Sequence, residues 1–264
     1  MKETVLITGA SSGIGLELAK CFADDGADLI LVARNTVALE QLAGKLRRDF
    51  SIQATVIPAD LTQNESAQKI FADVQGRGLT VDVLVNNAGF GLHGAFVELP
   101  LPRQLEIVSV NIAALVALTG FFLPGMLARQ SGGILNVGSV AGFVPGPNMA
   151  VYYASKAFVQ SFSEALHQEL RGTQVKLTNL CPGPTETNFS QTARMHRARA
   201  AQIKKMSAKA VAEIGHEDFR AGKFLSVPGV GNKLAAIAPR FLPRPVVRRL
   251  VAHYNQLKPT GQGT

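Results

Sequence analysis

Short apolar runs rich in β-branched residues alternate along the chain with longer stretches in which apolar residues recur at helical spacing. Seven such runs are predicted to form strands: Thr4–Thr8, Asp28–Ala33, Gln53–Pro58, Val81–Val85, Gly133–Val137, Val175–Leu180 and Phe224–Val227. Parallel strands need long right-handed crossovers, which the intervening helices would supply. The pattern therefore predicts an α/β fold, a doubly wound parallel sheet of about seven strands.

The alternation continues without repeats or low-complexity linkers, which predicts one domain over residues 1–264. A composition that is 47% hydrophobic is enough to fill its core. Residues 188–215 have helical patterning and little β character, and we interpret them as a lid over a site. Residues 230–264 form a basic C-terminal extension.

One stretch could be mistaken for a membrane span. Between Glu106 and Arg129 there are 22 residues without a charge, which is long enough to cross a bilayer. The stretch contains Asn111 and Pro124 and lies between two predicted strands, so a helix buried against the sheet is the better interpretation. The opening MKETVLITG lacks the features of a secretory leader, and we expect a cytoplasmic protein.

The cysteines and histidines indicate neither a disulfide nor a metal site. Cys21 and Cys181 are far apart in apolar contexts, which favours small buried thiols over a disulfide. The five histidines have no metal-ligand spacing, so no metal is expected.

A glycine-rich turn, TGASSGIG, follows the first predicted strand, and its Gly9, Gly13 and Gly15 open a helix. Glycines allow close approach to a pyrophosphate, and the free N–H groups at a helix N-terminus favour an anion. The alternative is a turn with no ligand. The spacing G-x-x-x-G-x-G also differs from the commoner G-x-G-x-x-G.

That spacing resembles the T-G-x-x-x-G-x-G motif of the short-chain dehydrogenase/reductase family. Further motifs of this family follow in order: Asp60, Asn86-Asn87-Ala88-Gly89, Asn111, Ser139, Tyr152 with Lys156, and Pro182-Gly183 with Thr187. The resemblance spans residues 4 to about 189 and implies a Rossmann-like fold that binds a nicotinamide dinucleotide.

The resemblance also implies which residues bind that cofactor. They are Gly9, Ser11, Ser12, Gly13, Ile14, Gly15, Arg34, Asp60, Leu61, Asn87, Ala88, Gly89, Tyr152, Lys156, Pro182, Gly183, Thr185 and Thr187. Asp60 would meet the adenine, and Thr187 the nicotinamide end. Their local alternatives are a helix N-cap for Asp60 and a turn hydroxyl for Thr187.

The end of the second predicted strand bears on the choice of cofactor. Relatives that use NAD tend to carry an acid there, which bonds the ribose 2′-hydroxyl. This chain has Ala33 followed by Arg34, whose planar guanidinium suits a 2′-phosphate, and Ser11 could add a hydroxyl. We therefore expect NADP(H) rather than NAD(H). The alternative for Arg34 is a solvated residue at the start of a helix.

Two adjacent tyrosines precede a lysine in AVYYASKAF, residues 150–158. Lys156 lies four residues after Tyr152 and three after Tyr153, so helical spacing alone does not choose between them. The family pattern Y-x-x-x-K selects Tyr152 as the catalytic acid/base.

The same resemblance gives roles to three neighbours of this tyrosine. Ser139 would bond the substrate oxygen, and Asn111 would hold a water that links Lys156 to solvent. The ammonium of Lys156 would lower the pKa of Tyr152 and bond the nicotinamide ribose. Each residue also has an ordinary structural interpretation, and their joint occurrence favours the functional one.

Residues 90–93 and 140–144 are mostly apolar and are expected to line the substrate side. A hydrophobic ketone or aldehyde, interconverted with its alcohol, is the expected substrate. We interpret His93 as a loop histidine more readily than as a substrate contact. The alternative function is a nucleotide-sensing or scaffold protein with little turnover, which the complete catalytic set disfavours. An epimerase of the extended branch fits poorly, because Ser12 stands where that branch has glycine.

Charge is distributed unevenly. Residues 190–264 hold 14 Lys/Arg and 3 Asp/Glu, a net charge of +11, whereas residues 1–189 carry −3. Solvated helix faces or an oligomer interface would account for this excess, and so would an anionic carrier or an acidic membrane surface. Nucleic acid is not expected. The family resemblance implies a homodimer or homotetramer formed through the helices that contain Asn111 and Tyr152.

Overall fold

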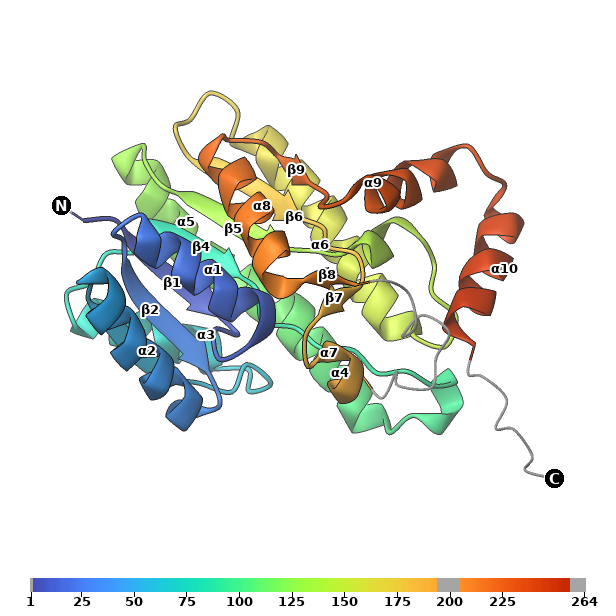
Figure 1. The fold of residues 1–264 in the computed structure, drawn as a ribbon, viewed down its shortest axis with the longest axis horizontal. Helices are drawn as coiled ribbons and strands as arrows, with labels where there is room; N and C mark the ends of the chain where they lie inside the picture. Colours follow the sequence, from blue (N-terminus) through green and yellow to red (C-terminus); the bar gives the residue numbers. More distant parts are fainter. Residues whose placement is uncertain (1, 194–204, 257–264) are drawn as a thin grey trace.

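The computed structural model describes residues 2–193 and 205–256. A seven-stranded parallel sheet with the order β3-β2-β1-β4-β5-β6-β9 forms the centre of the molecule (Figure 1). Its strands are β1 (Thr4–Thr8), β2 (Asp28–Ala33), β3 (Ala54–Pro58), β4 (Val83–Asn86), β5 (Gly133–Val137), β6 (Lys176–Leu180) and β9 (Leu225–Ser226). The predicted fold class is confirmed, and the strand bounds differ from the predicted ones by at most two residues.

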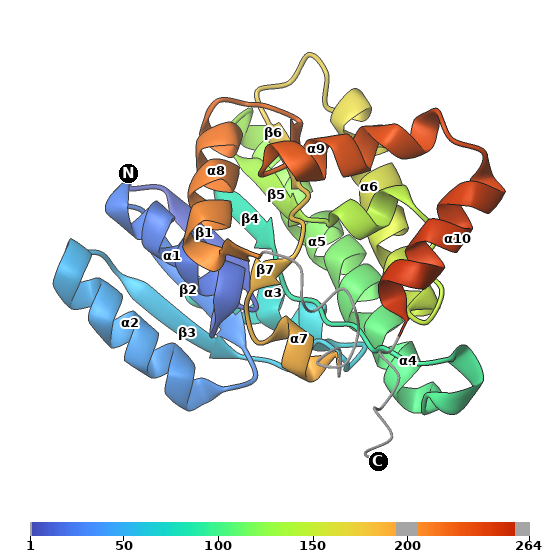
Figure 2. The ribbon, with the colours of Figure 1, turned by 45° about the vertical axis from the view of Figure 1, so that its right-hand side comes forward.

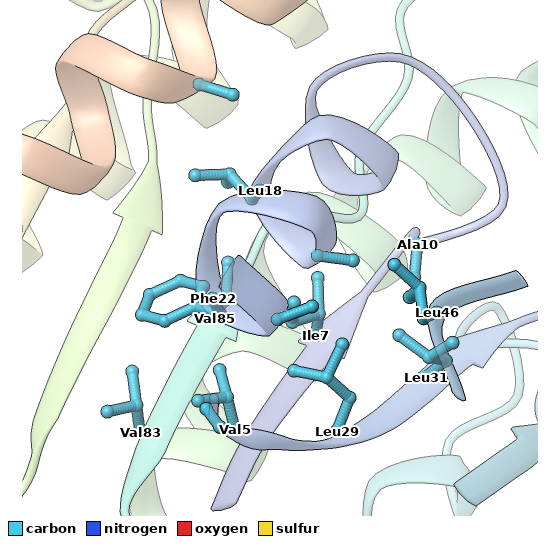
Figure 3. Packing of buried hydrophobic residues seen from close by; sticks show 14 of the residues in the cluster. Val5, Ile7, Ala10, Leu18, Phe22, Leu29, Leu31, Leu46, Val83 and Val85 are labelled. Carbon is cyan, nitrogen blue, oxygen red and sulfur yellow. The ribbon is translucent and has the colours of Figure 1, made fainter. Parts of the chain in front are cut away.

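Helices cover both faces of the sheet. One face carries α1 (Gly13–Asp24), α2 (Thr36–Phe50) and α8 (Ala208–Arg220). The other carries α3 (Ser66–Gly76), α5 (Ala114–Arg129) and α6 (Ala150–Glu169). Side chains alternate along each strand, so Val5 and Ile7 of β1 pack under α1 while Leu6 packs on the opposite face. Figure 3 shows the first of these two cores.

The long uncharged segment is a helix with a change of pitch. It lies within α4 (Leu101–Val108), one π turn (Ser109–Ala113) and α5, which follow one another without a break. Within the described residues, Leu101–Arg129 is long and apolar enough to cross a membrane by length and composition. Leu118, Phe122 and Met126 are nevertheless buried in the core under the sheet. The expected buried helix is therefore found, although α4 and the outer side of α5 face away from the sheet.

The segment expected to be a lid divides into parts of different character. After β6 the chain forms β7 (Thr185–Glu186), which pairs with β8 (Met206–Ser207), and a short helix α7 (Phe189–Thr192). Residues 194–204 lie outside the described residues. From Ala208 onward the chain is α8, whose Val211 and Ala212 are fully buried against the sheet. The predicted C-terminal end of the lid, residue 215, was therefore wrong, because it lies within α8 and the apolar face of α8 belongs to the core.

The C-terminal part adds two helices beyond the sheet. They are α9 (Val230–Ile237), continued by a 3-10 turn (Ala238–Arg240), and α10 (Arg244–Asn255). Figures 1 and 2 show both helices, in red, at one side of the molecule near α6. Both cysteines are free, with Cys181 buried and Cys21 partly buried.

Candidate active site

A cavity of about 1120 Å³ lies at the carboxyl ends of the strands. Its lining comes from the loops after β1, β2, β3, β4, β5 and β6 and from the C-terminal helices. Strand order reverses between β1 and β4, and ligands of open α/β sheets bind at such a switch point. This cavity is therefore the candidate active site.

Most of the residues expected to act in catalysis or cofactor binding line this one cavity. They are Gly9, Ser11, Ser12, Gly13, Ile14, Arg34, Asp60, Leu61, Asn87, Ala88, Gly89, Ser139, Tyr152, Lys156, Pro182, Gly183, Thr185 and Thr187. Gly15 and Asn111 are not part of the lining. Both lie directly behind it and hold its wall in place.

The glycine-rich turn needs its glycines for two physical reasons. Gly9 and Gly13 have φ angles of 67° and 58°, a left-handed conformation that glycine adopts without strain. A Cβ on Gly15 would collide with the side chain of Asn87 and with the carbonyl of Gly9. The turn can therefore close tightly, and the N-terminus of α1 is directed at the cavity.

Asn87 supports this turn from the neighbouring strand. Its Nδ2 donates to the carbonyl oxygens of Thr8 at 2.8 Å and Gly9 at 3.2 Å. The Thr8 hydroxyl accepts from the backbone N–H groups of Asn87 and Ala88, both at 3.0 Å. Sequence reasoning missed Thr8, although its place inside the glycine motif could have drawn attention to it. The Asn-Asn-Ala-Gly segment thus fixes the turn as well as lining the cavity.

The end of β2 brings Ala33 and Arg34 to the cavity wall, with Ser11 also in the lining. Arg34 is exposed and forms no ion pair within the described part of the chain. Its neighbour Asn35 caps α2 by accepting from the N–H of Ala38 at 3.1 Å. Asp60 accepts from the N–H of Thr62 at 3.1 Å, which makes a local turn and not the helix N-cap considered as its alternative, because α3 begins at Ser66.

The two adjacent tyrosines of α6 have different surroundings. The hydroxyl of Tyr152 lies beside the side chain of Ser139, which follows β5 and lowers the pKa of the phenol. Tyr153 instead donates to Oδ1 of Asn255 at 3.3 Å, so its hydroxyl is engaged by α10. Ser139 also accepts from the N–H of Ala141 at 3.1 Å and so caps the 3-10 turn Val140–Phe143. Of the two tyrosines, only Tyr152 presents its hydroxyl beside a serine of the cavity wall.

Lys156 is 6% exposed, and its Nζ donates to the carbonyl oxygen of Val137 at 2.7 Å. Burial lowers the pKa of Lys156 from 10.5 to about 8. Burial also raises the pKa of Tyr152 above its ordinary value, and the neighbouring side chain of Ser139 offsets part of that rise.

Burial is the largest influence on the pKa of both groups, and it acts in opposite directions on the phenol and the ammonium. The expected effect of Lys156 on the pKa of Tyr152 stays a prediction.

Asn111 lies in the π turn between α4 and α5 and is almost fully buried. Its Oδ1 accepts from the N–H of Phe90 at 3.1 Å, and its Nδ2 donates to the Phe90 carbonyl at 3.0 Å and to Ser155 Oγ at 2.9 Å. A Cβ on Gly89 would lie 3.1 Å from Asn111 Oδ1 and 3.5 Å from Lys156 Nζ. Asn111 thus holds the loop after β4 against the helix that carries Tyr152 and Lys156. Sequence reasoning did not find Ser155.

The loop after β6 lies under α9. A Cβ on Gly183 would collide with the side chain of Asn232, and Asn232 itself donates to the Pro228 carbonyl at 2.6 Å. Thr187 accepts from the N–H of Phe189 at 3.2 Å, and its methyl group lies over Gly13. Thr187 is therefore a turn hydroxyl and a member of the cavity wall at once. Asn232, which lines the cavity, has no signal in the sequence.

Of the residues expected to line the substrate side, Phe90, Val140, Ala141 and Val144 line the cavity, whereas residues 91–93, Gly142 and Phe143 do not. His93 is buried, and its Nε2 lies 2.6 Å from the carbonyl oxygen of Asn255. A carbonyl can only accept, so Nε2 donates. His93 therefore holds α10. It does not line the cavity, but it is a buried anchor and not the incidental loop histidine of the sequence interpretation. The residues of α9 and α10 that complete the wall, Tyr254 among them, were not found from sequence.

The family model described as short chain dehydrogenase matches residues 3–198. The chain is 34% identical over 194 residues to the very-long-chain 3-oxoacyl-CoA reductase of Anas platyrhynchos, which covers 72% of this chain and 62% of that protein. It is 38% identical over 198 residues to sulfoacetaldehyde reductase 2 of Chromohalobacter salexigens, covering 72% and 75%. The chain belongs to the short-chain dehydrogenase/reductase family and is an oxidoreductase of that family.

Solved structures agree with this assignment. A short-chain dehydrogenase from Sphingobium yanoikuyae in complex with NADPH has a TM-score of 0.81 at 31% identity, covering 90% of each chain. A short chain dehydrogenase/reductase from Burkholderia phymatum in complex with NAD has the same TM-score at 26% identity, covering 100% of this chain and 98% of that one. Similar structures thus bind either nicotinamide dinucleotide.

The cavity fits such a cofactor. Its volume is ample for a dinucleotide, and the N-terminus of α1 offers free N–H groups to a pyrophosphate. The collisions that a Cβ would make at Gly9 and Gly15 show that the backbone there packs too tightly for any side chain. When bound, the cofactor would exchange a hydride with the substrate carbon.

Proposed function

We propose that the protein interconverts a hydrophobic ketone or aldehyde and its alcohol, with NADP(H) as the preferred cofactor. The observation that carries this proposal is the meeting of Ser139, Tyr152 and Lys156 at the wall of a cavity that is apolar on its substrate side. A nucleotide sensor would have no chemical use for this arrangement.

Tyr152 is the proton donor for carbonyl reduction in this proposal. Its raised pKa keeps the phenol protonated at neutral pH, and the neighbouring Ser139 directs it at the position of the substrate oxygen. Ser139 steadies the negative charge that develops on that oxygen. Lys156 is positively charged below about pH 8, and its charge favours a phenolate once the proton has left. Asn111 acts by holding the loop after β4.

The preference for NADP(H) rests on Arg34. Arg34 lines the cavity beside Ala33, which carries no acid to repel a phosphate. With no acidic partner among the described residues, Arg34 can meet a 2′-phosphate with its planar donor pair.

The test is an NADPH-oxidation screen over ketones, aldehydes, quinones and 3-oxoacyl thioesters, in which Tyr152→Phe supplies the blank. Oxidation by the wild type that disappears in the variant supports the proposal. Tight NADPH binding with no oxidation of any of these substrates would favour a nucleotide-sensing protein instead.

A further inference from the structure

Large exposed apolar side chains gather on α9 and on the turn that follows it. Four of them are 52% to 82% exposed: Val230, Leu234, Ile237 and Phe241. At 100° per residue, the first three lie within about 60° of one another around the helix, and Phe241 continues their line beyond it. We call these four residues the apolar stripe. Single exposed apolar residues are ordinary, but a continuous stripe marks a contact surface.

The neighbouring helix extends this apolar surface toward the cavity. Leu242, Val246 and Leu250 recur every four residues on and just before α10, and all three are exposed. Leu242 and Leu250 also line the active-site cavity, as do Ala235 and Ala238 of the first helix and its turn. The apolar surface thus reaches the mouth of the cavity.

The same two helices carry an excess of positive charge. The exposed cations of α9, its turn and α10 are Lys233, Arg240, Arg244, Arg248 and Arg249. None of them forms an ion pair among residues 2–193 and 205–256. From Phe219 to Thr264 the sequence contains eight Lys/Arg and no Asp/Glu. The partner of this surface is therefore expected to be anionic.

We propose that the apolar stripe and the cations beside it dock the protein onto an anionic lipid bilayer. Lys233 and Arg240 lie to one side of the stripe, about 60° to 80° from Val230 around the helix. Apolar side chains that enter the lipid boundary while flanking cations meet the headgroups are the pattern of a helix lying in the membrane plane. A second copy of the chain fits less well, because a two-fold contact would set these cations against one another.

Docking in this way would open the cavity toward the bilayer, because Leu242 and Leu250 belong both to the exposed apolar surface and to the wall of the cavity. The substrate class that follows is a carbonyl compound dissolved in the membrane. This second step rests on the proposed reductase function, whereas docking itself does not.

Flotation of the full-length protein with vesicles tests the docking. Vesicles of phosphatidylcholine alone are compared with vesicles in which about a third of the lipid is phosphatidylserine. The protein should float with the second kind only. Binding should weaken as salt rises from about 0.01 M to about 1 M, because the Debye length falls from about 30 Å to about 3 Å.

Two double variants separate the apolar and charged contributions. Lys233→Gln with Arg240→Gln should weaken vesicle binding about 25-fold, at about fivefold for each charge. Leu234→Ser with Phe241→Ser should weaken it at least about tenfold through the lost apolar contact. The matched control is Val37→Ser with Lys45→Gln, which changes exposed residues of α2 and should bind like the wild type.

Three outcomes would contradict docking on a bilayer. They are no flotation of the wild type with anionic vesicles, equal flotation of the control and of Leu234→Ser with Phe241→Ser (the stripe variant), or loss of a dimer in the stripe variant when the wild type binds no vesicles.

Activity measurements test the second step, in which the substrate comes from the membrane. The stripe variant should keep its rate on a short water-soluble ketone and lose rate on a long-chain ketone held in anionic vesicles. Flotation without turnover of any ketone would refute the reductase proposal and leave docking standing.

Discussion

Lys156 should make the cofactor-free protein less stable at neutral pH than it would be with an apolar residue there. Burial lowers the pKa of Lys156 from 10.5 to about 8. At about 1.4 kcal/mol for each pH unit, keeping the buried ammonium charged costs the folded state about 3 kcal/mol. The hydrogen bond to Val137 returns about 1 kcal/mol of this. Lys156→Met should therefore raise the free energy of unfolding by about 2 kcal/mol at pH 7.

The sign of the pH dependence is the sharper part of this prediction. Between about pH 8 and pH 10.5 the unfolded chain holds a proton on Lys156 that the folded protein lacks, so the wild type gains stability as the pH rises. Its disadvantage relative to Lys156→Met should shrink over this range. Urea unfolding of both proteins at a series of pH values measures the difference, with the exposed Lys45→Met as the control. A difference that stays constant from pH 7 to pH 10 would refute the lowered pKa.

Three further predictions concern the active site and assembly. Tyr152→Phe should lower kcat at least about 100-fold while the Kd for NADPH stays within a few-fold. Tyr153→Phe should lower kcat far less, and a larger loss of kcat in Tyr153→Phe than in Tyr152→Phe would reject the choice of tyrosine. Ala33→Asp with Arg34→Ala should shift the kcat/KM ratio toward NADH at least about tenfold, whereas a wild type that uses both cofactors equally would show that Arg34 reads no phosphate. Leu105 lies on the exposed apolar side of α4. If that helix forms an oligomer interface, Leu105→Lys should reduce the molecular mass measured by light scattering. A wild type that is a monomer at micromolar concentration would contradict the interface.

The sheet and the nucleotide end could be predicted because their signals are local. Most strands contain a continuous buried run, such as Leu29–Val32 of β2. Gly9 and Gly13 are required by their own positive φ angles, which the motif spacing indicates without knowledge of the fold. The order of such elements follows from the rules for parallel crossovers. The positions of Ser139 and Tyr152 could be read from the family motifs for the same reason.

The C-terminal wall of the cavity could not be predicted, because its contacts join residues far apart in the sequence. Asn232 packs on Gly183, and Asn255 meets Tyr153, with nothing in the local pattern to indicate either contact. The family model also ends at residue 198, before α8 begins. The pKa of Lys156 was missed for a related reason, since burial and not charge pairing dominates it, and burial becomes known only from the fold.

Asn255 is the residue through which α10 is attached to the substrate side. Its Oδ1 accepts from Tyr153, its Nδ2 donates to the Pro147 carbonyl at 2.9 Å, and its own carbonyl accepts from His93. Asn255→Ala leaves the Tyr153 hydroxyl and the Pro147 carbonyl without these partners, at a cost of about 1–3 kcal/mol in stability.

Because the wall of the cavity is loosened while the cofactor end is untouched, KM for a bulky ketone should rise with little change in NADPH affinity. A double-mutant cycle with Tyr153→Phe isolates their hydrogen bond, since that variant removes the hydroxyl and keeps the ring. The two substitutions should be less damaging together than the sum of their separate effects on unfolding. Strict additivity would mean that Asn255 holds α10 through its other two contacts alone, and that Tyr153 has no part in closing the cavity.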